Sequence, residues 1–421
     1  MKKKIFILGA GISGLSLAFY LRKRFKDELE ITIFEAQNRV GGWIQTKKIK
    51  GCLFECGPRS FRVQELPLIK ELGLQDALIT ANPHAKTKYV AKEGILYKAP
   101  DSIGSFLTTA LGRKCLKALL SYPFRRKKKS GADESCQSYF HSHFGKDFTD
   151  SLINPLMAGI YAAHPEELSY QASFPSMKRG RGAKIYSFTE GMEMLPQALG
   201  GILQENILLQ KKVHGIREHT HAIELLCDDG VHRGDFLFST LSMNALRALF
   251  AEQDPLFSLL PHVPQASVVS VSLGYYEDLF SLSHKGFGFV VPSTVEKNLL
   301  GVVFDSNVFC EQNASYKTRL SIMLGGTRAP ELLMLNETEL IKMALSFCQK
   351  YLGQQKMADS ALVTYAHKAI SNYPVGHLVK LAQLENYLFK EKRRISLLGA
   401  GLYGVSVVDC IQQAEKVANN F

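Results

Sequence analysis

The sequence predicts an α/β protein in which a parallel sheet is built from both ends of the chain and an antiparallel sheet is inserted between them. Short β-rich segments run directly into GAGISG at residues 9–14 and into GAGLYG at residues 399–404. Between them, residues 268–324 contain short segments that alternate apolar and polar residues, such as VVSVSLGYY, which is typical of half-buried antiparallel strands. The two strand–glycine–helix units indicate one Rossmann-like domain that both termini complete.

The N-terminal unit has the spacing of a dinucleotide-binding turn. Gly9, Gly11 and Gly14 form a G-x-G-x-x-G pattern where a strand would become a helix. Gly9 permits the tight turn, Gly11 lets the backbone approach a pyrophosphate, and Gly14 lets the helix pack closely on the strand. The unpaired N–H groups and the positive dipole end of the helix would then bind the phosphates.

The same segment has a second interpretation, as an export signal or membrane anchor, because basic residues flank an uncharged run from Ile5 to Leu21. However, a strand-like segment, EITIFE, follows and ends in Glu35, and no A-x-A-like cleavage site follows the run. A carboxylate at this position accepts hydrogen bonds from a ribose and disfavours a 2′-phosphate. We therefore favour nucleotide binding, and the acidic residue argues against NADP.

The residues after Glu35 narrow the choice of cofactor. Arg39, Gly41, Gly42 and Trp43 lie in the segment EAQNRVGGW. This R-x-G-G extension resembles the flavin-binding amine oxidase and desaturase superfamily rather than simple NAD dehydrogenases. The resemblance implies that the cofactor is FAD and that these four residues belong to its site.

Changes in the sequence pattern divide the chain into three parts. Residues 1–80, 186–245 and 385–421 are expected to form a discontinuous FAD-binding domain. Residues 81–185 are expected to form a mostly helical region, and residues 246–384 an antiparallel-sheet, substrate-binding domain.

The charge balance suggests an acidic partner. The chain has 51 Lys and Arg residues against 39 Asp and Glu residues, a net charge of +12. Nucleic acid, an anionic membrane surface and a carboxylate-rich small molecule are the candidates. The densest basic run, Arg125–Ser130, is expected to be a solvated loop, and the lack of interleaved aromatic residues argues against nucleic acid.

Cysteine and histidine usage indicates neither a disulfide scaffold nor a metal centre. The eight cysteines are scattered without CxxC pairs, which suits a reducing, cytoplasmic compartment, with peripheral binding to the inner face of the membrane as an extension of that expectation. Two close histidine pairs, His141 with His143 and His219 with His221, lack the partners that a metal site requires. We therefore expect no bound metal.

Several segments together resemble one enzyme family. GPRSFR (57–62), NPLMAGIYAAHPEELS (154–169), SNYPVGH (371–377) and GAGLYGVSVVDCI (399–411) are similar to stretches of the oxygen-dependent protoporphyrinogen and coproporphyrinogen III oxidases. The resemblance covers nearly the whole chain. It implies an FAD enzyme of haem biosynthesis that removes six electrons from a porphyrinogen and passes them to oxygen. It also implies that the helical region touches the membrane.

The resemblance carries over to particular residues. It implies that Val213 packs on the adenine and that Gly404, Val405 and Val407 line the flavin. Lys88 stands where many members have an arginine that anchors a substrate carboxylate; a lysine keeps the charge but loses the planar fork.

Residue chemistry alone also singles out Arg59. Its guanidinium suits a propionate, although a structural salt bridge is the alternative. No side chain is assigned as a catalytic acid or base, because FAD carries the redox chemistry.

Other functions stay open from the sequence. An amine oxidase or a carotenoid-type desaturase would use the same FAD domain, and a flavin-free binding protein could share the fold. The sequence does not choose between protoporphyrinogen and coproporphyrinogen, and it leaves the oligomeric state undetermined.

Overall fold

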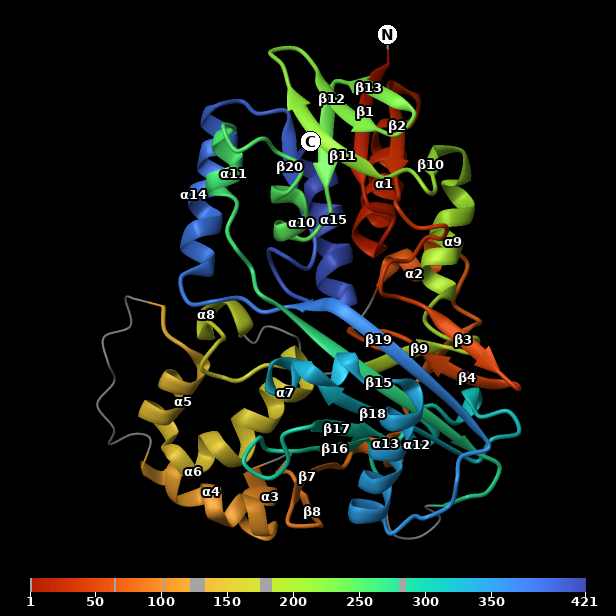
Figure 1. Cartoon of the computed structure of the whole chain (residues 1–421), viewed down its shortest axis with the longest axis vertical. Coiled ribbons are helices and arrows are strands. Elements are labelled where there is room, and N and C mark those ends of the chain that lie inside the picture. The colour runs from red at the N-terminus through yellow and green to blue at the C-terminus, as the bar shows by residue number, and fades with distance from the viewer. Residues whose placement is uncertain (1, 64–65, 101–102, 122–132, 175–183, 280–284) are drawn as a thin grey trace.

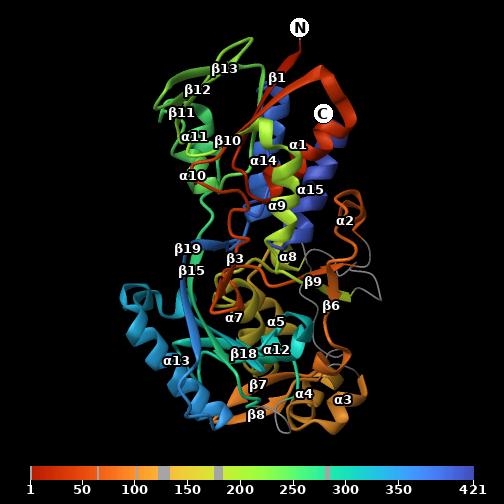
Figure 2. The same cartoon turned by 90° about the vertical axis from the view of Figure 1, so that its right-hand side faces the viewer.

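The computed structural model describes residues 2–63, 66–100, 103–121, 133–174, 184–279 and 285–421. The basic run Arg125–Ser130 lies outside the described residues. Figure 1 shows two sheets stacked along the long axis of the molecule, with both chain termini at the same end. Figure 2, turned by 90°, shows that two long strands, β15 (Gln265–Tyr275) and β19 (Ser360–Ser371), run from one half toward the other.

A five-stranded parallel sheet forms one half, and it contains strands from four separate parts of the chain. Its strand order is β10-β2-β1-β14-β20. The central β1 pairs with β2 on one side and β14 on the other. The strands are β1 (Lys3–Leu8), β2 (Leu29–Phe34), β10 (Ile207–Leu208), β14 (Phe236–Ser239) and β20 (Ile395–Leu397). This arrangement confirms the predicted Rossmann-like sheet that both termini complete.

Alternation along β1 explains the layers that cover this sheet. Ile5 and Ile7 pack in a cluster with α1 (Ile12–Phe25), α9 (Met194–Ile202) and α15 (Val407–Asn420). Phe6 and Leu8 point to the opposite face because successive side chains of a strand alternate. That face is covered by a second, antiparallel sheet of three strands and by helices, namely β11 (Val213–Glu218), β12 (Ile223–Cys227), β13 (Gly230–Gly234), α10 (Met243–Arg247), α11 (Pro255–Leu259) and α14 (His377–Lys390).

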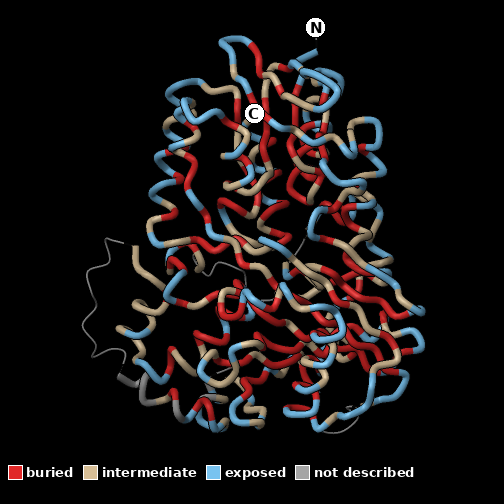
Figure 3. The backbone as a smooth tube through the Cα atoms, viewed as in Figure 1, coloured by how far each residue is buried: buried red, intermediate tan, exposed pale blue. Residues whose placement is uncertain are grey.

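A seven-stranded sheet forms the other half, in the order β19-β15-β18-β17-β16-β7-β8. Val269, Val271 and Leu273 of β15 are buried in a cluster with the helix α13 (Glu337–Leu352). The remaining strands are β7 (Lys88–Lys92), β8 (Ile95–Lys98), β16 (Gly288–Val290), β17 (Leu299–Val303) and β18 (Thr318–Gly325). The predicted antiparallel sheet is therefore present, and Figure 3 shows buried backbone in both halves.

Two of the predicted boundaries differ from the structure. Residues 88–98, expected in the helical region, form β7 and β8, because β7 adds in parallel to β16 at the edge of the seven-stranded sheet. The boundary expected at residue 385 falls inside α14, whose Leu381 and Leu384 pack against the parallel sheet. Both differences arise from tertiary pairing that local patterns do not reveal.

Helices fill most of the remaining described segment between β8 and residue 174. They are α3 (Ile103–Thr108), α4 (Ala110–Ser121), α5 (Cys136–Phe144), α6 (Lys146–Phe148), α7 (Asn154–Tyr161) and α8 (Tyr170–Ser173). Short elements complete the fold: α2 (Pro67–Glu71), α12 (Asp305–Val308), β3 (Thr46–Ile49), β4 (Cys52–Glu55), β5 (Phe61–Val63), β6 (Leu78–Thr80) and β9 (Lys184–Phe188). Within the part of the chain that the structure describes, no helix combines the length and apolar character needed to span a bilayer.

Candidate cofactor and substrate site

A cavity of about 750 Å³ lies where the two halves meet. It is lined from one side by the glycine turn after β1 and from the other by β15 and β19. Nine of the residues expected at the site line it: Gly9, Gly11, Glu35, Gly41, Gly42, Trp43, Arg59, Val405 and Val407. The cavity therefore brings the predicted nucleotide residues and one predicted substrate residue into a single space.

The glycine turn is shaped by three different requirements. Gly9 has φ +96°, a conformation that favours glycine. A Cβ at Gly14 would lie 2.0 Å from the Gly9 carbonyl oxygen, so only glycine lets α1 start this close to β1. A Cβ at Gly11 would meet no atom within 4 Å, so the backbone there faces open space. This cradle at the start of α1 fits a pyrophosphate.

Glu35 is held in place at the end of β2. Its carboxylate is buried and accepts hydrogen bonds from the backbone N–H groups of Ala10 (2.8 Å) and Gln37 (2.8 Å). The residue also lines the cavity. The carboxylate is thereby fixed beside the turn, at the position from which it can accept a ribose hydroxyl.

Arg39 and Gly14 support the site without lining the cavity. The Arg39 guanidinium donates to the carbonyl oxygens of Val40 (3.0 Å), Gly42 (2.6 Å) and Ile44 (3.3 Å). It therefore shapes the loop that carries Gly41, Gly42 and Trp43 rather than contacting the cavity itself. Gly41 donates from its N–H to the Ala10 carbonyl (2.8 Å), which ties this loop to the glycine turn.

The C-terminal loop, residues 398–406 between β20 and α15, forms another wall of the cavity. Ser406 caps the helix, since its hydroxyl accepts from the Asp409 N–H at 3.1 Å. Val405 and Val407 line the cavity, but Gly404 does not; its φ of +79° and a Cβ position 2.6 Å from Asp409 Cγ mark it as a turn residue. The start of α15 faces the same space, where its dipole favours negative charge.

Two buried side chains hold this loop from behind. The Tyr373 hydroxyl donates to the Ala400 carbonyl at 2.7 Å, and His377 Nε2 lies 2.9 Å from the Leu402 carbonyl. The two rings stack with centroids 4.6 Å apart, and burial lowers the pKa of His377, so the neutral ring donates from Nε2. Tyr373 and His377 of the SNYPVGH segment therefore position the C-terminal loop.

We expect Tyr373→Phe to weaken cofactor binding several-fold and to lower the free energy of unfolding by about 1 kcal/mol, because one neutral hydrogen bond is lost. FAD titration of the apoprotein and thermal denaturation measure the two effects. Tyr365→Phe is the matched control: its hydroxyl also donates to a backbone carbonyl, that of Leu335 at 2.8 Å, but outside the cavity. Equal FAD affinities for the two variants would contradict the positioning role.

Arg59 combines the two roles that the sequence left open. Its Nη2 donates to the Ser270 hydroxyl at 3.1 Å, and its Nε lies 3.4 Å from an Asp305 carboxylate oxygen. The side chain lines both the large cavity and an adjoining one of about 210 Å³. Arg59 is therefore part of a largely buried ion pair and also presents a cation to the cavity.

Lys88 and Val213 do not line the large cavity. Lys88 Nζ lies 5.9 Å from the centroid of the Phe287 ring, which lines the smaller cavity beside Arg59. Val213 begins β11, two residues after Lys211, whose N–H donates to the Glu35 carbonyl at 2.8 Å. Their roles toward substrate and adenine stay predictions.

Glu55 belongs to the same buried charge cluster as Arg59 and Asp305. Burial raises the pKa of Glu55 to about 7, although hydrogen bonds from the Met192 N–H and the Thr46 hydroxyl and the charge of Arg59 act in the opposite direction. Because the pKa of Glu55 is higher in the folded protein than in the unfolded chain, the folded protein is more stable when this carboxyl is protonated. The free energy of unfolding therefore decreases as pH rises from about 4.5 to about 7.

We expect Glu55→Gln to remove this decrease, which is about 3 kcal/mol for the shift from 4.5 to about 7. Urea denaturation at a series of pH values measures it. The variant should match the wild type near pH 4.5 and exceed it near pH 7.5; parallel pH curves for the two proteins would contradict the assignment.

Several residues of the cavity wall carry no signal in the sequence. Residues of β19 around Lys368 line it because the pairing of β19 with β15 shifts between Ala266 and Val268. Lys368 has φ +50°, and its N–H donates to the Ser267 hydroxyl at 2.8 Å. The irregularity adds a second cation to the wall, and no local motif marks it.

Comparison with known proteins assigns the fold to a family. The model of the flavin-containing amine oxidoreductases matches residues 12–420. The chain belongs to this family. The family's flavin together with the dinucleotide turn and Glu35 identifies the cofactor as FAD, and the open backbone at Gly11 and the carboxylate at Glu35 fit it. The chain is an oxidoreductase.

Individual relatives and solved structures match the chain over 99–100% of its length. Coproporphyrinogen III oxidase of Bacillus subtilis (strain 168) is 28% identical over 460 residues, covering 100% of this chain and 98% of the relative. Protoporphyrinogen oxidase of Bos taurus is 28% identical, covering 99% and 98%. A crystal structure from Exiguobacterium sp. 255-15 matches with a TM-score of 0.87 at 22% identity, covering 100% of this chain and 98% of that one, and reduced UDP-galactopyranose mutase with 0.78 at 16%, covering 100% and 94%.

Proposed function

We propose that this family member oxidises a porphyrinogen, protoporphyrinogen IX or coproporphyrinogen III, to the porphyrin in haem biosynthesis. The observation that carries the proposal is the full-length similarity, at 28% identity, to oxidases named for these two substrates. The cavity supports it, since it joins the dinucleotide cradle to a wall that contains both apolar side chains and cations.

The side chains suit a flat, apolar substrate that carries carboxylates. Trp43, Ile160 and Met323 offer apolar surface to a macrocycle. Arg59 and Lys368 offer cations from different walls, and each could bind one propionate. These residues would orient the ring and exclude water, and no side chain needs to act as a general base because the released protons can pass to water.

When bound, FAD would supply the two-electron redox chemistry, from the substrate to an electron acceptor, that no side chain of the site provides. We propose oxygen as that acceptor. Each oxidation by two electrons then converts one oxygen molecule to hydrogen peroxide, and three such oxidations convert the porphyrinogen to the porphyrin. The glycine turn, Glu35 and the loop before α15 would hold the cofactor against the substrate-binding wall.

Aerobic assay of the purified flavoprotein tests the proposal. With each porphyrinogen in turn, we expect porphyrin fluorescence to rise above the rate of spontaneous oxidation and peroxide to form in proportion. The preferred substrate is the one with the higher kcat/KM. Rapid oxidation of simple amines with no effect on either porphyrinogen would instead identify an amine oxidase.

We also propose peripheral binding to anionic lipid, which the net charge of +12 supports. Liposomes that contain phosphatidylserine should carry the protein upward in a flotation gradient at low salt and lose it as salt is raised, because charge interactions are screened. Failure to float at low salt would remove this part of the proposal.

A further inference from the structure

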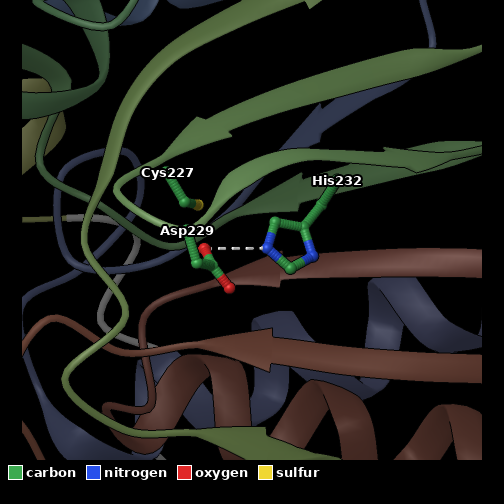
Figure 4. A group of neighbouring side chains, drawn as sticks. All are labelled: Cys227, Asp229 and His232. Atoms are coloured by element: carbon green, nitrogen blue, oxygen red, sulfur yellow. Dashed lines mark hydrogen bonds and ion pairs between the residues drawn. The ribbon is translucent and has the colours of Figure 1, made fainter.

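Three side chains with metal-binding atoms converge at the tip of the hairpin formed by β12 and β13. They are Cys227, Asp229 and His232, and their sulfur, oxygen and nitrogen donor atoms all lie within 4.8 Å of one another. Figure 4 shows the Asp229 carboxylate extending toward the His232 ring, with the Cys227 side chain on the same side. This cluster is separate from the cavity residues described above.

The strand register explains why these residues meet. Cys227 pairs with Gly230, and His232 pairs with Leu225. Because side chains alternate along a strand, Cys227 and Leu225 point to one face of the hairpin, and His232 points to that face as well. Asp229 lies in the turn that joins the strands. The C-x-D-x-x-H spacing in a hairpin therefore places all three donors on one face.

From this arrangement we propose that Cys227, Asp229 and His232 bind a zinc ion, with water as the fourth ligand. Zn²⁺ accepts sulfur, nitrogen and oxygen donors in tetrahedral geometry, whereas Mg²⁺ and Ca²⁺ prefer oxygen donors alone. A thiolate and a carboxylate together balance the charge of the ion. The expectation of no bound metal rested on the absence of CxxC pairs and on the two histidine pairs His141/His143 and His219/His221, none of which includes His232.

Neighbouring residues fix two of the ligands. Lys211 Nζ lies 2.6 Å from one Asp229 oxygen, and His232 Nε2 lies 3.2 Å from the other. The Phe34 ring packs edge-on against His232, with centroids 5.2 Å apart. Lys211 orients the carboxylate but also repels a cation, so we expect weaker binding than at four-ligand structural zinc sites.

A bound zinc ion would stabilise the half of the molecule that contains the parallel sheet and Glu35. Phe34 is the last residue of β2 and directly precedes Glu35, and the Lys211 N–H donates to the Glu35 carbonyl. The ion would therefore link the hairpin to the strand that ends in the ribose-binding carboxylate. The proposal does not depend on the identity of the substrate.

Metal titration of the purified, tag-free flavoprotein tests the proposal. We expect one equivalent of Zn²⁺ to bind and to raise Tm, and Co²⁺ to give the near-ultraviolet charge-transfer absorption of a thiolate ligand. Cys227→Ser and His232→Ala should each weaken Zn²⁺ binding at least tenfold while keeping normal flavin content, which shows that they are folded.

Two variants serve as matched controls. His214→Ala removes a histidine of the neighbouring strand β11 that pairs with Asp228 at 2.7 Å, and Cys310→Ser removes an exposed thiol elsewhere. Both should bind Zn²⁺ as the wild type does. Wild-type protein without thiolate absorption on Co²⁺ addition, or unchanged Zn²⁺ binding in Cys227→Ser, would overturn the proposal.

Discussion

Glu35→Ala is expected to lower the affinity of the apoprotein for FAD about 100-fold. The carboxylate would accept the ribose hydroxyls, and a hydrogen bond to a charged group contributes about 1.5–3 kcal/mol. Its removal also leaves the Ala10 N–H, now bonded at 2.8 Å, without an acceptor beside the phosphate cradle. Fluorescence titration of the apoprotein with FAD measures the change.

Two comparisons make this test specific. Glu35→Gln retains an acceptor for Ala10 but not one for both N–H groups, so its affinity should lie between those of the wild type and Glu35→Ala. FMN lacks the adenosine ribose, so whatever affinity it has should be the same in all three proteins. FAD affinity of Glu35→Ala within threefold of the wild type would show that the ribose assignment is wrong.

Arg59→Met is expected to lower the free energy of unfolding by about 3 kcal/mol or more, because it leaves the Asp305 carboxylate without its partner. Only 16% of the Arg59 side chain and 15% of the Asp305 side chain are exposed, and breaking a buried ion pair on one side typically costs about 3–5 kcal/mol. The same substitution removes the cation proposed to bind a propionate. Urea denaturation and porphyrinogen kinetics measure the two effects.

The double variant Arg59→Met with Asp305→Asn separates stability from substrate binding. The amide that replaces the carboxylate is neutral, and its oxygen could still accept from the Ser321 hydroxyl, which now lies 2.7 Å from Asp305. We expect most of the stability to return while KM for the porphyrinogen stays at least tenfold higher than in the wild type. A normal KM in the double variant would mean that Arg59 is only a structural residue.

The parts of the fold that the sequence predicted are those with local signals. The glycine turn needs Gly9 and Gly14 because the backbones touch there, and alternation in β15 marks which residues face α13. The prediction that β7 belongs to the helical region was wrong, because nothing within residues 88–92 indicates that they pair in parallel with β16. Strand partners depend on distant segments, and short apolar runs do not specify them.

The residues of the candidate site also fall into two groups, those that a local sequence signal identifies and those that only the tertiary structure brings to the site. Glu35 and the R-x-G-G residues could be identified because they follow one another within a short stretch. Asp305, which pairs with Arg59, and Lys368, which lines the cavity through an irregular strand pairing, could not be identified. Their roles arise only when the two halves of the molecule come together.

The central claim is that FAD held in this cavity takes electrons directly from a porphyrinogen. Anaerobic mixing of the purified flavoprotein with coproporphyrinogen III or protoporphyrinogen IX tests it most directly, with the flavin absorbance followed in time. We predict that at least one of the two bleaches the oxidised flavin spectrum while porphyrin absorption appears, and that air restores the flavin. A chain that purifies without flavin, or a flavin that neither porphyrinogen reduces, would contradict the account.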